Sequence, residues 1–108
     1  MTAVVTMLCA AADREEAARL ARALVEQRLA ACVQALPIDS WYRWDGAVQQ
    51  AAEVLLLIKT TRDRADAVTA RLAELHSYDL PEIIMLPVEG GLPAYLDWVA
   101  ASVGESEG

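Results

Sequence analysis

One stretch of the sequence decides the fold, residues 32–60, which read CVQALPIDSWYRWDGAVQQAAEVLLLIKT. Near its centre Asp45-Gly46 is a tight-turn signal with strand-like residues on both sides, so the stretch predicts a β-hairpin. The first arm is expected over residues 32–44, broken near Pro37 and resumed at Ser40. The returning arm is expected from about residue 48 to residue 60.

The chain before the hairpin predicts one strand and one helix. Residues 3–9 contain Thr6 as their only polar residue and predict a buried strand. Asp13 is a suitable N-cap, and Glu15 and Glu16 favour the positive end of a helix dipole. We therefore expect an amphipathic helix from this point to about residue 31.

The chain after the hairpin predicts a helix, a strand and a further short helix. Thr61 or Asp63 is expected to cap the first of these helices, which ends near His76. Residues 82–89 predict the strand, and Pro93 suits the first turn of a helix that runs to residue 103. The expected anchors of this last helix are Tyr95, Leu96, Trp98 and Val99.

This order of elements, βαββαβ, is the ferredoxin-like pattern of the α+β class, in which two helices cover one face of an antiparallel sheet. Its usual strand order is 4-1-3-2, which places Pro37 and Pro87 on the two edge strands, where proline is tolerated. We expect a single domain over residues 1–103, including the short extra C-terminal helix, and an acidic tail over residues 104–108.

Composition limits the class of protein. The chain has 108 residues, 56% of them hydrophobic, with a net charge of −7, so it is a folded globule that would repel nucleic acid and anionic membranes. We expect neither as a partner. There is no secretory signal pattern, and apolar runs such as residues 54–58 are far too short to span a bilayer, so a cytoplasmic protein is expected. Both cysteines, Cys9 and Cys32, are expected to be reduced.

The strand residues do not alternate between apolar and polar, although a sheet with helices on one face should do so. Residues 54–58 and 83–86 are unbroken apolar runs, so both faces of the sheet are expected to be buried. The chain supplies too few helices to cover both. A second copy of the same sheet is the simplest cover, which predicts self-assembly.

Five motifs in order resemble the CutA divalent-ion tolerance family. They are LAACV at 29–33, SWYRWDG at 40–46, LIKT at 57–60, HSYDLPEII at 76–84 and YLDW at 95–98. The resemblance implies a ferredoxin-like fold, a tight homotrimer around a threefold axis, a link to tolerance of copper and other divalent metals, and a fold shared with the PII signalling proteins. It implies no established reaction. The chain departs from the family pattern at Ala10-Ala11-Ala12, Gln34 and Ser77.

Three residues are candidate metal ligands: His76, Cys32 and Glu82. Imidazole and thiolate suit copper, and one histidine per chain allows only an open or shared site, so weak binding of copper or another divalent cation is expected, with none tightly bound. The alternatives are structural. Cys32 would then be a small buried hydrophobe, and His76 would cap a helix by bonding a backbone carbonyl.

A second hypothesis is a PII-like sensor that binds a small anionic metabolite in clefts between subunits, with Lys59, Tyr78 and Trp44 as contacts. The alternatives are a structural salt bridge from Lys59 to Glu82 or to a neighbouring subunit, and an interface role for the tryptophan. A third class, an acyl- or phosphoryl-transfer enzyme, would need Cys32 and His76 within hydrogen-bond reach. We expect no enzyme and assign no catalytic residue.

Overall fold

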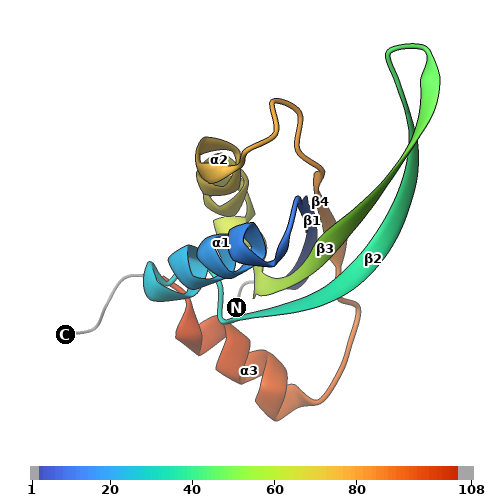
Figure 1. Cartoon of the computed structure of the whole chain (residues 1–108). Helices are drawn as coiled ribbons and strands as arrows, with labels where there is room; N and C mark the ends of the chain where they lie inside the picture. Colours follow the sequence, from blue (N-terminus) through green and yellow to red (C-terminus); the bar gives the residue numbers. More distant parts are fainter. Residues whose placement is uncertain (1–2, 105–108) are drawn as a thin grey trace.

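The computed structural model describes residues 3–104 and confirms the predicted α+β architecture (Figure 1). Its elements are β1 (Val4–Ala11), α1 (Arg14–Glu26), β2 (Cys32–Trp44), β3 (Ala47–Thr61), the 3₁₀ turn η1 (Arg62–Arg64), α2 (Ala65–Leu75), β4 (Ile83–Pro87) and α3 (Pro93–Ser102). The antiparallel sheet has the order β2-β3-β1-β4, which is the predicted 4-1-3-2 counted from the other edge.

Helices α1 and α2 pack together on one face of the sheet, and the core lies between them and the strands (Figure 1). Burial of apolar side chains from both layers supplies the main stabilisation of this unit. The helices contribute the buried residues Ala17, Leu20, Leu24, Val68 and Leu72. The strands contribute Val5, Met7, Cys9, Leu56 and Ile58.

Strands β2 and β3 are longer than β1 and β4, and their paired ends leave the sheet as a curved arm (Figure 1). At the tip, Asp45 and Gly46 have φ angles of 51° and 76°, the left-handed values that a two-residue hairpin turn requires. The predicted break near Pro37 is wrong, since this residue pairs with Val54 inside a continuous ladder. An edge strand allows this because it pairs on one side only.

Two predicted helix ends differ from the structure. Helix α1 begins at the predicted cap, where Asp13 accepts the N–H of Glu16, but it ends at Glu26 instead of near residue 31. Arg28 has a φ of 58°, which stops the helical path. The predicted caps of α2 are also wrong: η1 precedes the helix, whose N-cap is Arg64.

Helix α3 packs more loosely than predicted. Of its four expected anchors only Val99 is buried, whereas Tyr95 and Trp98 are exposed, with ring centroids 5.6 Å apart. Gly104, expected to begin a free tail, instead exchanges two hydrogen bonds with Arg28, one from its N–H and one to its carbonyl oxygen. The rest of the predicted tail, residues 105–108, lies outside the described residues.

The second face of the sheet carries apolar side chains that α1 and α2 do not cover. We call this surface the open face and define it by Leu8, Leu36, Leu55, Leu57, Ile84 and Leu86. Leu8 pairs with both Leu57 and Ile84. Leu36 pairs with Leu55, whereas Leu86 pairs with Thr6. These six residues are half-buried or exposed. Burial along β3 alternates, although its sequence does not.

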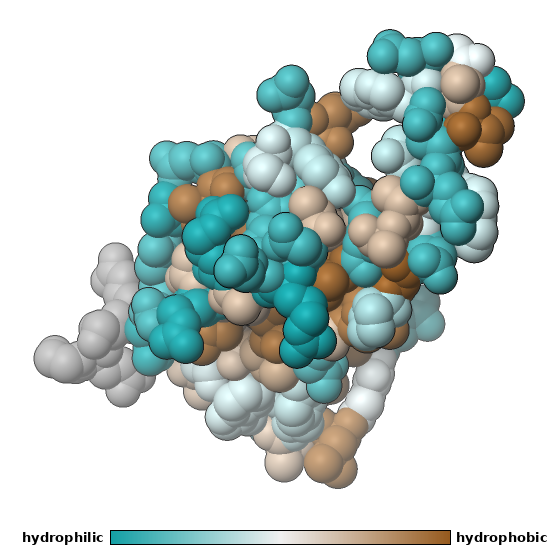
Figure 2. Space-filling model, viewed as in Figure 1, coloured by the Kyte–Doolittle hydropathy of each residue, from teal (hydrophilic) through white to brown (hydrophobic). Residues whose placement is uncertain are grey.

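Figure 2 shows mainly polar side chains over the helices on the near side, and a mixture of polar side chains with a few hydrophobic ones on the arm. Trp41 and Val48, both on the arm, are each 65% exposed. Within residues 3–104, no helix has the length and hydropathy needed to cross a membrane.

Candidate functional site

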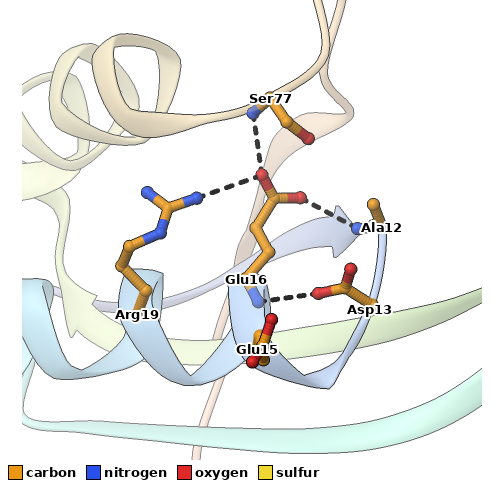
Figure 3. Close-up of a pocket in the computed structure, with 6 residues that line it drawn as sticks. All are labelled: Ala12, Asp13, Glu15, Glu16, Arg19 and Ser77. Atoms are coloured by element: carbon orange, nitrogen blue, oxygen red, sulfur yellow. Dashed lines mark hydrogen bonds and ion pairs between the residues drawn. The ribbon is translucent and has the colours of Figure 1, made fainter.

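The carboxylate of Glu16 organises a polar site where β1 meets α1 and the loop after α2 (Figure 3). Its Oε1 accepts the N–H of Ala12 at 2.9 Å, its Oε2 accepts the N–H of Ser77 at 2.8 Å, and Arg19 lies 3.4 Å from Oε2. The side chain is only 5% exposed. Sequence reasoning missed these contacts, because it identified Glu16 only as a residue that suits the helix dipole.

The pKa of Glu16 results from opposing effects. Burial favours the neutral acid and raises the pKa, but the hydrogen bonds from Ala12 and Ser77 favour the carboxylate. The hydrogen bonds prevail, and the pKa of Glu16 lies below its ordinary value of 4.5. The residue is therefore a fixed anion at neutral pH.

His76 follows α2, and its imidazole ring is fully buried. Nε2 lies 2.8 Å from the carbonyl oxygen of Ala10, and Nδ1 accepts the N–H of Tyr78 at 3.0 Å. A neutral ring with its hydrogen on Nε2 satisfies both partners. The imidazole thus meets a backbone carbonyl, as the structural alternative expected, but this carbonyl belongs to β1 and not to a helix end. His76 could ligate a metal only by giving up one of these bonds. Its role as a ligand stays a prediction.

Strand register separates Cys32 from the other two candidate metal ligands. Cys32 pairs with Lys59, which pairs with Thr6, whereas His76 bonds Ala10, four residues further along β1. At about 3.4 Å per residue this is a separation of roughly 13 Å along the strand. Within one chain, Cys32 and His76 therefore lie too far apart to act as a nucleophile and its general base.

Glu82 directly precedes β4, whose Ile83 pairs with Cys9, so it belongs to the same end of the sheet as His76. Across residues 3–104, no three His, Cys, Asp or Glu side chains are grouped so that they could hold a metal ion. The three candidate ligands thus do not fit a metal site built by one chain.

Both cysteines are free, in different surroundings. Cys9 is buried, and burial, with smaller effects of Glu82 and Glu16, raises its pKa to about 12, so it is an inert core residue. Cys32 is partly exposed at the start of β2. Burial and then a hydrogen bond with this thiol raise the pKa of Tyr95.

The three candidate contacts of a small anion lie in three places. Tyr78 donates its hydroxyl to Oε2 of Glu53 at 2.9 Å, and its ring lies 4.8 Å from that of His76. Burial and this bond raise the pKa of Tyr78 to about 12. Trp44 is half exposed at the tip of the arm, where it pairs with Ala47. Only other copies of the chain could bring Tyr78, Trp44 and Lys59 together.

Lys59 lies at the end of the sheet opposite His76 and donates its ammonium to Oε1 of Gln34 at 2.7 Å. The expected salt bridge to Glu82 is absent among residues 3–104, and no ion pair of this part of the chain includes Lys59. A hollow of about 400 Å³ opens beside it, between the sheet and the start of α3. Sequence reasoning found Lys59 but not this hollow, which depends on how α3 folds back.

Comparison with known proteins identifies the family. The profile described as "CutA1 divalent ion tolerance protein" matches residues 5–102. The chain is 46% identical over 100 residues to the divalent-cation tolerance protein CutA of Pectobacterium atrosepticum, with 92% of this chain and 91% of that protein covered.

A sequence and a solved structure from rice extend the comparison. Protein CutA 1, chloroplastic, of Oryza sativa is 45% identical over 95 residues, which cover 87% of this chain but only 54% of that protein, so the chain spans about half its length. The crystal structure of CutA1 from Oryza sativa superposes with a TM-score of 0.94 at 40% identity and covers 97% of each chain. The chain therefore belongs to the CutA1 divalent ion tolerance protein family.

Proposed function

We propose that the protein works as a cytoplasmic homotrimer in divalent-cation tolerance, and that it is a binding protein rather than an enzyme. The observation that carries the assembly is the open face, where Leu36, Ile84 and Leu86 are 42%, 47% and 45% exposed. Apolar side chains gathered on one sheet face favour burial against a matching surface. The number of copies, three, is proposed from the resemblance to the CutA family.

The arm supports the same proposal. Its exposed aromatic residues, Trp41, Tyr42 and Trp44, are of the types enriched in interfaces between subunits. The chain measures 47 Å along its longest axis but only 21 Å along its shortest, a shape that leaves the arm free to reach a neighbour (Figure 1). Sedimentation equilibrium tests the proposal: a mass three times the 11.7 kDa of one chain supports it, and a monomer at micromolar concentration contradicts it.

We further propose that copper is contacted weakly through Cys32, at a site completed by groups from other copies. Cys32 is a soft donor with partial exposure, while Cys9 is buried and both ring nitrogens of His76 are engaged. Calorimetric titration of copper into the native protein, Cys32→Ser and His76→Asn tests this. Affinity lost only in Cys32→Ser supports the thiol, whereas affinity lost only in His76→Asn moves the site to the histidine.

A second candidate function is a PII-like sensor of a small anion. One observation favours it: Lys59 has no carboxylate partner among residues 3–104 and lies beside an open hollow. Tyr78 and Trp44 do not line this hollow, so the proposed binding site keeps Lys59 and leaves the other two residues out.

A further inference from the structure

The hollow beside Lys59 has an unusual charge for this chain. The protein carries a net charge of −7, yet the hollow is lined, among the residues that the structure describes, by one cation and by no aspartate or glutamate. Lys59 is also the single lysine of the sequence, whose other basic residues are eight arginines. Its ammonium has three N–H donors, and Gln34 takes one of them. Two donors are thus left for a ligand with negative charge.

The rest of the wall is mostly apolar. Its apolar side chains come from Val4, Val88, Leu92 and Leu96. The hydroxyl-bearing residues Thr6 and Tyr95 and the two glycines Gly90 and Gly91 also line it. Its volume of about 400 Å³ falls within the range of roughly 300–1,000 Å³ that is usual for small-molecule sites. A ligand that fills it must therefore carry a short apolar body as well as a charge.

We propose that this hollow binds a small monocarboxylate with a short apolar chain, the carboxylate on Lys59 and the chain against Leu92 and Leu96. The proposal rests on the second candidate function, the anion sensor, and names its ligand class. A phosphate group fits the wall less well, because phosphate sites gather several donors, such as an arginine fork or a helix N-terminus. Here one ammonium is the only charged donor.

The single lysine allows a direct test on the native assembly. Apart from the N-terminus, Lys59 carries the one primary amine of the chain, so the rate of its modification by an amine-selective reagent can be followed by mass spectrometry. Hexanoate is expected to slow this modification. It should give the same protection as acetate at a concentration at least tenfold lower. The reason is that each methylene buried against the apolar wall contributes roughly a fourfold gain in affinity.

Three variants separate charge from apolar contact, with calorimetry of hexanoate and hexanol as the readout. Lys59→Met keeps the length of the side chain but removes its charge, and should abolish the preference for hexanoate over hexanol. Lys59→Arg should restore part of that preference. Leu96→Ala should weaken the affinity for hexanoate at least threefold and leave the affinity for acetate unchanged. Arg43→Met, on the arm, is the control for the loss of a positive charge elsewhere.

The outcomes distinguish this ligand class from the sensor function. Equal protection by acetate and hexanoate, or better protection by inorganic phosphate, would overturn the monocarboxylate but keep a sensor of small anions. Equal affinity for hexanoate and hexanol in the native protein would show an apolar hollow without a role for the charge, and would overturn both. If neither carboxylates nor inorganic phosphate protect Lys59 from modification at millimolar concentration, both the monocarboxylate ligand and the sensor function are overturned.

Discussion

The carboxylate of Glu16 accepts the backbone N–H of Ser77 at 2.8 Å, across 61 residues of sequence. This bond ties the first turn of α1 to the loop that follows α2 (Figure 3). The loop carries His76, bonded to Ala10, and Tyr78, bonded to Glu53 on β3. Glu16 thus fixes the start of a chain of contacts that leads to the base of the arm.

Glu16→Gln should lower the free energy of unfolding by about 1–3 kcal/mol. The amide keeps one acceptor oxygen, so either the N–H of Ala12 or that of Ser77 loses its partner in a buried place. Urea denaturation of the variant measures the loss. The control is Glu15→Gln, an exposed neighbour on the same helix turn, which should change stability by less than about 0.5 kcal/mol. Equal losses in the two variants would contradict this account.

The lowered pKa of Glu16 predicts how stability depends on pH. Its folded-state pKa lies below the ordinary 4.5, so the carboxylate stabilises the fold above pH 4.5, and this contribution is lost as the pH falls through the folded-state pKa. The native protein should lose more stability than Glu16→Gln over this acidic range and match its slope above pH 6. Urea denaturation at a series of pH values measures both. Parallel curves throughout would show that Glu16 does not titrate differently in the folded state.

The bond between Tyr78 and Glu53 predicts a spectroscopic signature. Burial and the Glu53 carboxylate raise the pKa of Tyr78 to about 12. Glu53→Gln removes the charge and should lower this pKa toward the ordinary 10, which an absorbance titration of tyrosinate detects. Tyr78→Phe identifies the transition by deleting it. If Glu53→Gln leaves the titration unchanged, the hydrogen bond does not form in solution.

Much of the fold could be predicted because its signals are local. The cap at Asp13, the turn at Asp45-Gly46 and the placement of Pro37 and Pro87 on edge strands each depend on a few adjacent residues, and the structure confirms them. The end of α1 and the start of α2 were predicted wrongly, because the positive φ of Arg28 and the 3₁₀ turn before α2 depend on tertiary contacts. The predicted end of α2 near His76 is confirmed.

The candidate site was harder to predict, because it depends on strand register. Nothing in the spacing of Cys32, Lys59 and His76 shows that the first two share a row of the sheet while the third lies about four residues away along β1. The hydrogen-bond partners of Glu16 could not be predicted either, because they depend on how the helices pack. Ser77 meets it only because α2 packs beside α1.

Two adjacent leucines of β3 should separate folding from assembly. Leu56 is fully buried in the core, whereas Leu57 is half-buried on the open face, although the apolar run around them does not alternate. Leu56→Asp places a carboxylate between the sheet and the helices at a cost of several kcal/mol, which is comparable with the total stability of a small domain. This variant should lack a cooperative unfolding transition.

Leu57→Asp should instead keep the fold of the single chain and block assembly, because its carboxylate is solvated until a second copy covers the open face. Sedimentation equilibrium should give the mass of one 11.7 kDa chain, and far-ultraviolet circular dichroism should retain the native mixture of helix and strand. Leu57→Met, which conserves volume and hydrophobicity, is the matched control and should assemble like the native protein. An oligomer of unchanged melting temperature in Leu57→Asp would show that the open face is not the interface, and the assembly would then have to depend on the arm alone.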